Sequence, residues 1–301
     1  VSIQLKSDTK WAKAGFEVKH EQFAINDRLA TAFSPMSLKT GREADMKEAL
    51  EWFDIVKPHF FRAPLDNDKG FGNWIAKDWK NNRLDSPETV TVKPLDAKRN
   101  ADGTVTVTTT QECRYANGKI TTDYVYTMDA DGSVYFSATY TPEGQLPPLP
   151  CIGNTFLMDK DMTRLSWYGQ GLQDSYVDRL EATGIGRWTS SVDQEYVHYP
   201  RPQSSGNHEQ TVTLSLTDAK GRGYTVTTAN ATPFAFSALP YSEHQLSTVA
   251  HDCDLHTENN VFLNIDAAMM GLGNSSCGPG VLTKYSIPQK QHSLHVMFKR
   301  K

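Results

Sequence analysis

The chain has 301 residues, and at about 100 to 200 residues per domain this length allows one large domain or two smaller ones. Its 31 Lys and Arg against 35 Asp and Glu give a net charge of −4, and no dense basic block marks a nucleic-acid binder. A mean hydropathy of −0.52 without a run of about 20 apolar residues excludes a membrane-spanning helix, and 10% aromatic residues exclude a disordered chain.

The first 25 residues contain two strand-like runs, 1–5 and 16–23, which a turn at 13–15 joins into a hairpin. A hairpin of this size cannot form its own core, so we expect it to pack on a larger domain or on a preceding segment. Because the sequence opens on Val1 and no signal segment follows, we interpret the chain as a processed or excised piece.

Helical patterns are few and short. Residues 41–55 carry apolar side chains near helical spacing, residues 75–80 could form one turn, and residues 242–250 begin with a serine cap. Helices therefore contribute little to the predicted fold.

Alternation with period two dominates from residue 89 onward, in runs rich in Val, Thr and Tyr. The runs are 89–95, 103–110, 119–128, 133–140, 211–216 and 223–228. Short turns separate consecutive runs, which requires antiparallel pairing. Ten or more such strands predict an all-β, large two-sheet sandwich, whose edges we expect long loops such as 160–210 to cover.

Side chains that could bind metal ions are scattered or poorly spaced. The cysteines Cys113, Cys151, Cys253 and Cys277 form no CxxC pair, and whether any of them form bridges stays open. Segment 251–256 (HDCDLH) holds four potential ligands, but strand alternation would split them between two faces, which favours a polar loop. In 66–70 (DNDKG) the glycine is misplaced for a calcium loop, which favours a tight turn.

Several aromatic residues have polar neighbours, as in carbohydrate-binding surfaces. They are Trp74, Trp79, Trp167, Tyr168, Tyr176, Trp188, Tyr196 and Tyr199. Sandwich cores use the same residue types, and core packing is the better prediction for any one of them.

Residues 58–70 (PHFFRAPLDNDKG) closely resemble the FxRAPxDND signature of family 2 glycoside hydrolases of the beta-galactosidase type. Further segments resemble family motifs in the same order: 146–153 (LPPLPCIG), 167–179 (WYGQGLQDSYVDR), 199–207 (YPRPQSSGN) and 263–280 (LNIDAAMMGLGNSSCGPG). Residues 10–23 (KWAKAGFEVKHEQF) resemble the strand that closes the preceding immunoglobulin-like domain. Five ordered motifs are far more specific than one.

The resemblance implies the carboxy-terminal region of a bacterial hydrolase of this type. Residues 1–28 would end an immunoglobulin-like domain, 29–50 would form a linker and first strand region, and 51–301 an antiparallel supersandwich of the galactose-mutarotase-like type. Retaining hydrolysis in this family uses two Glu about 5 Å apart on a (β/α)8 barrel, which an all-β chain of this length cannot also contain. The resemblance therefore implies no catalytic residue, metal site or cofactor in this chain, and places any Mg or Na in the barrel.

The implied partners are the catalytic barrel and other domains of the parent enzyme, together with a galactoside or plant oligosaccharide, but no nucleic acid or membrane. The substrate-binding candidates at the active-site mouth are Gly70, Phe71, Asn73, Trp74, Ser276 and Cys277. The signature residues are Arg62, Asp66, Asn67, Asp68, Tyr176, Asp178 and Arg179. Oligomeric state and compartment, bacterial periplasm or cytoplasm, stay open.

This sequence departs from the family pattern at several polar positions. Cys277 stands where the family has a tryptophan that stacks on sugar, and either a buried inert thiol or a residual site role fits it. Cys151 and Gln170 replace arginines, and Ser204 replaces a glutamate. Loss of Arg and Glu together is expected of a former buried ion pair, so we hypothesise a rebuilt polar pocket that joins these positions.

Two alternatives come from other classes of protein. A stand-alone carbohydrate-binding module would use exposed tryptophans. A free aldose mutarotase would need a general acid and base, for which His198, His208, His251 and Glu195 are the candidates.

Overall fold

The computed structural model describes residues 1–23, 42–70 and 75–301, and divides them into two compact units. The N-terminal unit is the predicted hairpin, in which β1 (Ser2–Gln4) pairs antiparallel with β2 (Glu17–His20). Its apolar side chains, Trp11 and Phe16 among them, stay exposed, as expected of two strands without a core. No helix among the described residues is long and apolar enough to span a bilayer.

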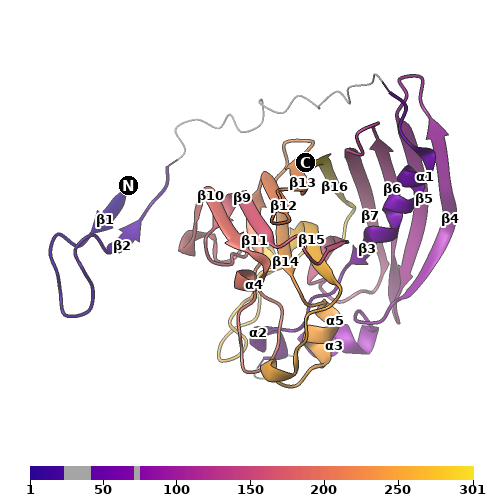
Figure 1. The fold of residues 1–301 in the computed structure, drawn as a ribbon. Helices are drawn as coiled ribbons and strands as arrows, with labels where there is room; N and C mark the ends of the chain where they lie inside the picture. Colours follow the sequence, from indigo (N-terminus) through magenta and orange to yellow (C-terminus); the bar gives the residue numbers. More distant parts are fainter. Residues whose placement is uncertain (24–41, 71–74) are drawn as a thin grey trace. The chain divides into compact units, whose positions relative to one another are not determined.

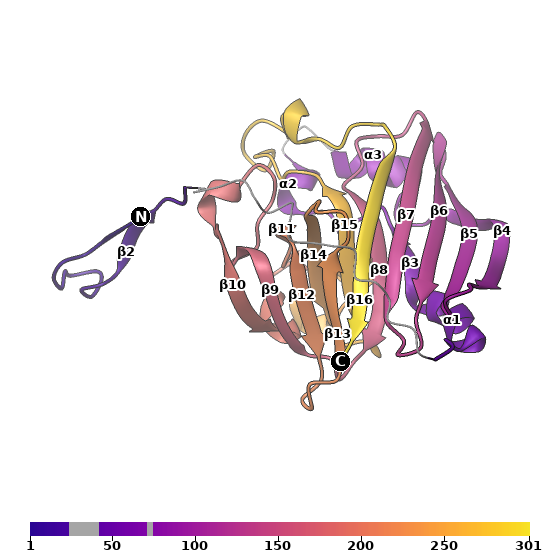
Figure 2. The same cartoon turned by 90° about the horizontal axis from the view of Figure 1, so that it is seen from above.

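The second unit is built on a nine-stranded sheet in the order β10-β9-β12-β13-β16-β7-β6-β5-β4, with antiparallel neighbours throughout (Figure 2). The strands are β4 (Glu88–Arg99), β5 (Val105–Arg114), β6 (Gly118–Met128), β7 (Val134–Gly144), β9 (Arg164–Gly171), β10 (Gly184–Ser191), β12 (Thr213–Thr217), β13 (Gly223–Thr228) and β16 (His292–Arg300). The predicted meander is therefore confirmed.

A five-stranded sheet, in the order β11-β14-β15-β8-β3, lies against one face of the large one (Figure 1) and behind it in Figure 2. Its strands are β3 (Val56–His59), β8 (Cys151–Asp159), β11 (His208–Thr211), β14 (Phe234–Leu239) and β15 (Asn260–Met269). All six residues of β14 are buried, so this strand shows no alternation in the sequence. The fold is all-β with two large antiparallel sheets, as predicted.

The helices are short, as their sequence patterns predict. They are α1 (Met46–Glu51), η1 (Trp52–Ile55), α2 (Asp66–Lys69), α3 (Ile75–Asn82), η2 (Leu180–Ala182), α4 (Val192–Glu195), α5 (Glu243–Thr248), η3 (Asp252–Asp254) and η4 (Thr283–Tyr285). Asp45 caps α1, and the Ser242 hydroxyl accepts a hydrogen bond from the Gln245 N–H at 3.2 Å to cap α5.

Aromatic side chains from both sheets form the core between them. Trp52 of η1 packs against Phe136 and Phe298 of the large sheet and against Phe156 of the small one, with ring centroids 5.6–6.0 Å apart. Phe156 and Phe298 also meet directly, at 4.6 Å. These contacts fix the two sheets face to face.

The expectation of a long covering loop over 160–210 is wrong. This stretch contains β9 and β10, which extend the large sheet to its edge. Glycines hide the strand pattern there. A Cβ at Gly171 or Gly186 would lie 2.7 Å from the Trp188 ring, so both positions must be bare for this ring to pack on the sheet.

Candidate functional site

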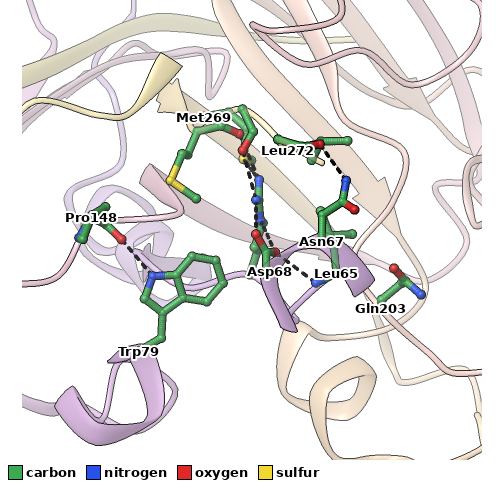
Figure 3. A network of polar contacts seen from close by, with 12 residues as sticks. Leu65, Asn67, Asp68, Trp79, Pro148, Gln203, Met269 and Leu272 are labelled. Atoms are coloured by element: carbon green, nitrogen blue, oxygen red, sulfur yellow. Dashed lines mark hydrogen bonds and ion pairs between the residues drawn. The ribbon is translucent and has the colours of Figure 1, made fainter. Parts of the chain in front are cut away.

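The signature residues converge at one end of the sandwich. We name this region the DND corner and define it as Arg62, helix α2, residues 176–179 and the loop 269–277. At its centre, the Arg62 guanidinium forms a two-point ion pair with the Asp68 carboxylate, with N–O distances of 2.8 and 3.2 Å. Both side chains are fully buried, and Asp68 also accepts the Leu65 N–H at 2.9 Å. Figure 3 shows Asp68 on α2 and its contact with the Leu65 N–H.

Arg62 also anchors the strand end that leads into the loop. Its guanidinium donates to the carbonyl oxygens of Met270 and Gly271, at 3.0 and 3.4 Å, and lies 5.8 Å from the ring centroids of both Trp79 and Tyr176. A fully buried arginine needs such partners because an unpaired charge is costly in the interior. Arg62 is therefore a structural residue of the corner.

Asp66 and Asn67, the two signature residues before Asp68, contact segments outside α2. The Asn67 amide donates to the Gly273 carbonyl in the loop beside Leu272, at 2.8 Å (Figure 3). The Asn67 side-chain oxygen accepts the Ser276 hydroxyl. Asp66 is exposed and exchanges two hydrogen bonds with Gln203, at 3.1 and 3.3 Å. Asn67 thus fixes the position of Ser276 beside α2, although 209 residues separate them.

Residues 178 and 179 hold the same loop from its other side. The Asp178 carboxylate accepts the Leu272 N–H at 3.0 Å and the Gly273 N–H at 2.8 Å. Arg179 donates to the Gly273 carbonyl at 2.5 Å and to the Asn274 side chain at 3.2 Å. The loop is therefore pinned by side chains from two distant segments.

We predict that Asp178→Asn loosens this loop. Asparagine keeps one acceptor oxygen but loses the charge, and its NH2 group replaces the second carboxylate oxygen that the Leu272 N–H also contacts, so we expect a loss of about 1–3 kcal/mol, mostly local. Hydrogen exchange of the amides in 270–276 should accelerate at least five-fold, whereas the exposed control Asp193→Asn should leave it unchanged. Unchanged exchange in Asp178→Asn would contradict the bracing role of this carboxylate.

The candidate substrate-binding residues fall into two groups. Phe71, Asn73 and Trp74 lie outside the described residues. Gly70 ends α2 with a φ of +56°, and Ser276 and Cys277 are exposed on the pinned loop. The interpretation of Cys277 as a buried inert thiol is wrong, because the turn at 274–277 turns it outward. The structure thus brings Ser276 to the signature helix.

The structure gives the three positions of the hypothesised rebuilt pocket different partners, which does not support one shared pocket. The Ser204 hydroxyl donates to the buried Glu243 carboxylate at 3.1 Å, and the Cys151 sulfur lies 3.8 Å from the His59 Nε2. Gln170 instead accepts the Thr183 hydroxyl at 2.6 Å. It sits on β9 of the large sheet, whereas Cys151 begins β8 of the small one, which explains the separation.

Buried titratable side chains around Cys151 were missed from the sequence. The His59 Nδ1 lies 2.7 Å from the Asp266 carboxylate, and its Nε2 lies 3.8 Å from the Cys151 sulfur. Burial raises the pKa of Cys151 to about 11 and raises that of Glu243. No spacing in the sequence signals this group, because 207 residues separate His59 from Asp266.

The residues named for a mutarotase or a carbohydrate-binding module are mostly buried or have separate partners. His208 pairs with Glu195 at 2.5 Å inside the fold, whereas His198 bonds Asp252 at the surface and His251 is exposed. The predicted core role is confirmed for Trp79, Trp167, Tyr176 and Tyr196, which are buried. Tyr168, Trp188 and Tyr199 are half-buried, and Trp74 lies outside the described residues. A stacking platform of exposed tryptophans is therefore not supported by these residues.

The strand topology and the braced DND corner define an all-β sandwich domain, and comparisons with known proteins specify the family. Residues 32–298 match the family model described as "Beta galactosidase small chain". The chain belongs to this family and corresponds to a C-terminal region of beta-galactosidases.

Individual relatives agree with this assignment. The chain is 31% identical to "Beta-galactosidase BgaC" of Bifidobacterium adolescentis, over 99% of this chain and 31% of that protein. It is 27% identical to a beta-galactosidase of Streptococcus thermophilus, over 91% of this chain and 28% of that protein. The chain thus spans about a third of the length of these relatives.

The solved structures that match include a galactose mutarotase related enzyme from Lactobacillus acidophilus. Its sequence identity is 12%, its TM-score is 0.24, and the match covers 71% of this chain and 68% of that one. At this score the likeness carries no argument, so the fold description rests on the strand topology alone.

Proposed function

We propose that this chain is the C-terminal part of a family 2 beta-galactosidase that hydrolyses terminal beta-D-galactosides by the retaining mechanism. In this proposal the chain shapes the mouth of the active site and binds carbohydrate there, while another segment of the parent enzyme supplies the catalytic barrel. The observation that carries the proposal is the DND corner, where a buried ion pair and side chains from two distant segments hold a loop that carries the exposed Ser276.

The chemistry of the corner suits sugar hydroxyls. The Asp66 carboxylate and the Ser276 hydroxyl are exposed and joined through α2 and Asn67. Carboxylates, amides and hydroxyls are the groups that exchange hydrogen bonds with sugars, and a preorganised set lowers the entropic cost of binding. The bracing by Arg62 and Asp178 supplies this preorganisation.

Catalysis would reside outside this chain. Retaining glycosidases place two carboxyl groups about 5–5.5 Å apart at the scissile bond, and family 2 enzymes carry them on a (β/α)8 barrel of eight parallel strands. Among the described residues, every strand pair is antiparallel, which differs from such a barrel. The role left to this chain is to position substrate.

The first test is complementation. We expect the purified chain alone to release no product from a chromogenic galactoside, and the parent enzyme to lose activity without this chain and regain it when the chain is added back. Hydrolysis by the chain alone, or full activity of the parent without it, would contradict the proposal.

A second prediction addresses the corner. In the whole enzyme, Ser276→Ala should raise KM about 3- to 10-fold with little change in kcat, because a hydrogen bond made equally in the ground and transition states is lost. The exposed Ser293→Ala on β16 is the matched control and should change neither constant. Equal KM values for both variants would place the substrate elsewhere.

A further inference from the structure

Three neighbouring strands of the five-stranded sheet bring an imidazole, a carboxylate and a thiol to one face. His59 ends β3, Asp266 lies on β15, and Cys151 begins β8 between them. His59 and Asp266 are both register partners of Gly153, on opposite sides of β8. Cys151 is two residues from Gly153 on the same strand and therefore shares its face.

Gly153 makes the meeting of these side chains sterically feasible. A Cβ at this position would lie 2.2 Å from the Asp266 Oδ1 and 2.3 Å from the Ile265 carbonyl oxygen. Because the position is bare, the His59 Nδ1 and the Asp266 Oδ1 approach to 2.7 Å across β8. The glycine thus leaves a gap in the sheet face that the polar group fills.

The donor atoms have the spacing of a metal site. One donor atom from each of His59, Cys151 and Asp266 lies within 4.8 Å of the others, and all three residues are buried. The His59 Nε2 and the Cys151 Sγ are 3.8 Å apart. A zinc ion bound about 2.0–2.1 Å from nitrogen and about 2.3 Å from sulfur at the tetrahedral angle holds these two atoms about 3.5–3.6 Å apart. An ion therefore fits between them after the two side chains approach by about 0.2–0.3 Å, without movement of the strands.

The other ring nitrogen of His59, Nδ1, contacts a carboxylate, which is a usual second partner of metal-binding histidines. The contact of Nδ1 with Asp266 fixes the orientation of the ring and directs Nε2 toward the sulfur. The other carboxylate oxygen of Asp266 is buried and has no hydrogen-bond partner in the part of the chain that the structure describes. Such a carboxylate is costly unless a nearby positive charge compensates it.

A pocket of about 250 Å³ lies on one side of this group, and His59 is the member that lines it. Glu243 lines the same pocket, but its carboxylate oxygens accept hydrogen bonds from the Ala63 N–H and the Ser204 hydroxyl. One thiolate and one imidazole form a donor pair that suits zinc and related divalent transition metals better than Mg or Ca.

We propose that the His59 Nε2 and the Cys151 Sγ bind a zinc-type divalent ion, with Asp266 orienting the imidazole. Binding forms the metal–sulfur and metal–nitrogen bonds and releases to solvent the thiol proton together with any proton on the His59 Nε2. The ion links β3 to β8 just before the chain enters the DND corner, since Arg62 follows His59 by three residues. Its role is structural, and it does not depend on the proposed function.

The test uses the full chain carrying Cys253→Ser and Cys277→Ser, which removes the two exposed thiols. Titration with Co²⁺ should give one equivalent of binding and a thiolate-to-cobalt charge-transfer band, which Zn²⁺ should abolish by displacement. At a hundred-fold excess of zinc over Kd, Tm should rise by about 5 °C. Adding Cys151→Ser should remove the band, and adding Cys113→Ser, the other buried thiol, should leave it intact.

Absence of the charge-transfer band in the protein that lacks only the exposed thiols would overturn the proposal, and so would a band that survives Cys151→Ser. If Cys151→Ser does not fold, zinc-edge X-ray absorption on the protein with Cys151 intact decides. A shell with one sulfur and at least one imidazole supports the site, whereas a shell of oxygen and nitrogen alone overturns it. The same data test the expectation from sequence that the chain holds no metal.

Discussion

Replacing Arg62 by methionine is expected to lower the free energy of unfolding of the chain by about 3–5 kcal/mol, the cost of removing one partner of a buried ion pair. Methionine fills a similar volume but leaves the Asp68 carboxylate buried without its counter-charge. The Met270 and Gly271 carbonyl oxygens lose their donor as well. Urea unfolding followed by tryptophan fluorescence measures the change.

Two further variants distinguish the cost of leaving a charge buried without a partner from the cost of losing an ion-pair contact. Arg222→Met removes an equally short ion pair, with Asp218 at 2.7 Å, but the Arg222 side chain is 70% exposed, so its removal should cost at most about 1 kcal/mol. Adding Asp68→Asn to Arg62→Met removes the stranded charge and keeps an acceptor for the Leu65 N–H, so part of the stability should return. Equal costs for Arg62→Met and Arg222→Met would refute this account.

The strands of the large sheet could be predicted because one face of each is exposed to solvent, so that apolar and polar residues alternate along the sequence. In β6 the burial pattern alternates almost residue by residue, and the sequence alternates with it. The small sheet gave no such signal, since β14 is buried along its whole length. Gly169 and Gly171 interrupted the pattern of β9, because their bare Cα atoms make room for Thr211 and for the Trp188 ring.

The DND corner could be predicted only through the family resemblance. Nothing local to Asn67 indicates that its amide bonds a carbonyl 206 residues away. The motifs identified the participating segments, and the structure then showed which atoms meet. His59, Glu243 and Asp266 stayed unpredicted because each looks like an ordinary strand or helix residue, and only the strand order β15-β8-β3 and the bare Gly153 bring the first and last together.

The second large effect expected is a fall in stability with rising pH that depends on Glu209. This residue of β11 is buried, and burial raises the pKa of its carboxyl from 4.5 to about 8. The hydrogen bond that the Asn207 amide donates to it at 3.1 Å acts in the opposite direction and lowers this pKa. Between these two values the unfolded chain releases a proton that the folded chain retains. Stability should therefore decrease by about 1.4 kcal/mol per pH unit, or roughly 4 kcal/mol from pH 5 to pH 8.

Glu209→Gln isolates this contribution, because the amide is nearly isosteric and cannot ionise. The Asn207 side-chain oxygen has no partner among the described residues and can accept from the new amide. The free energy of unfolding of the variant should increasingly exceed that of the parent chain as pH rises. The two values should be close at pH 5 and furthest apart at pH 8. Glu88→Gln, at an exposed position of β4, should run parallel to the parent chain throughout. If the unfolding free energies of Glu209→Gln and the parent chain instead differ by the same amount at every pH, the Glu209 carboxyl is ionised in the folded protein. The buried groups around Asn207 must then replace the hydrogen-bond donors that water gives to an exposed carboxylate.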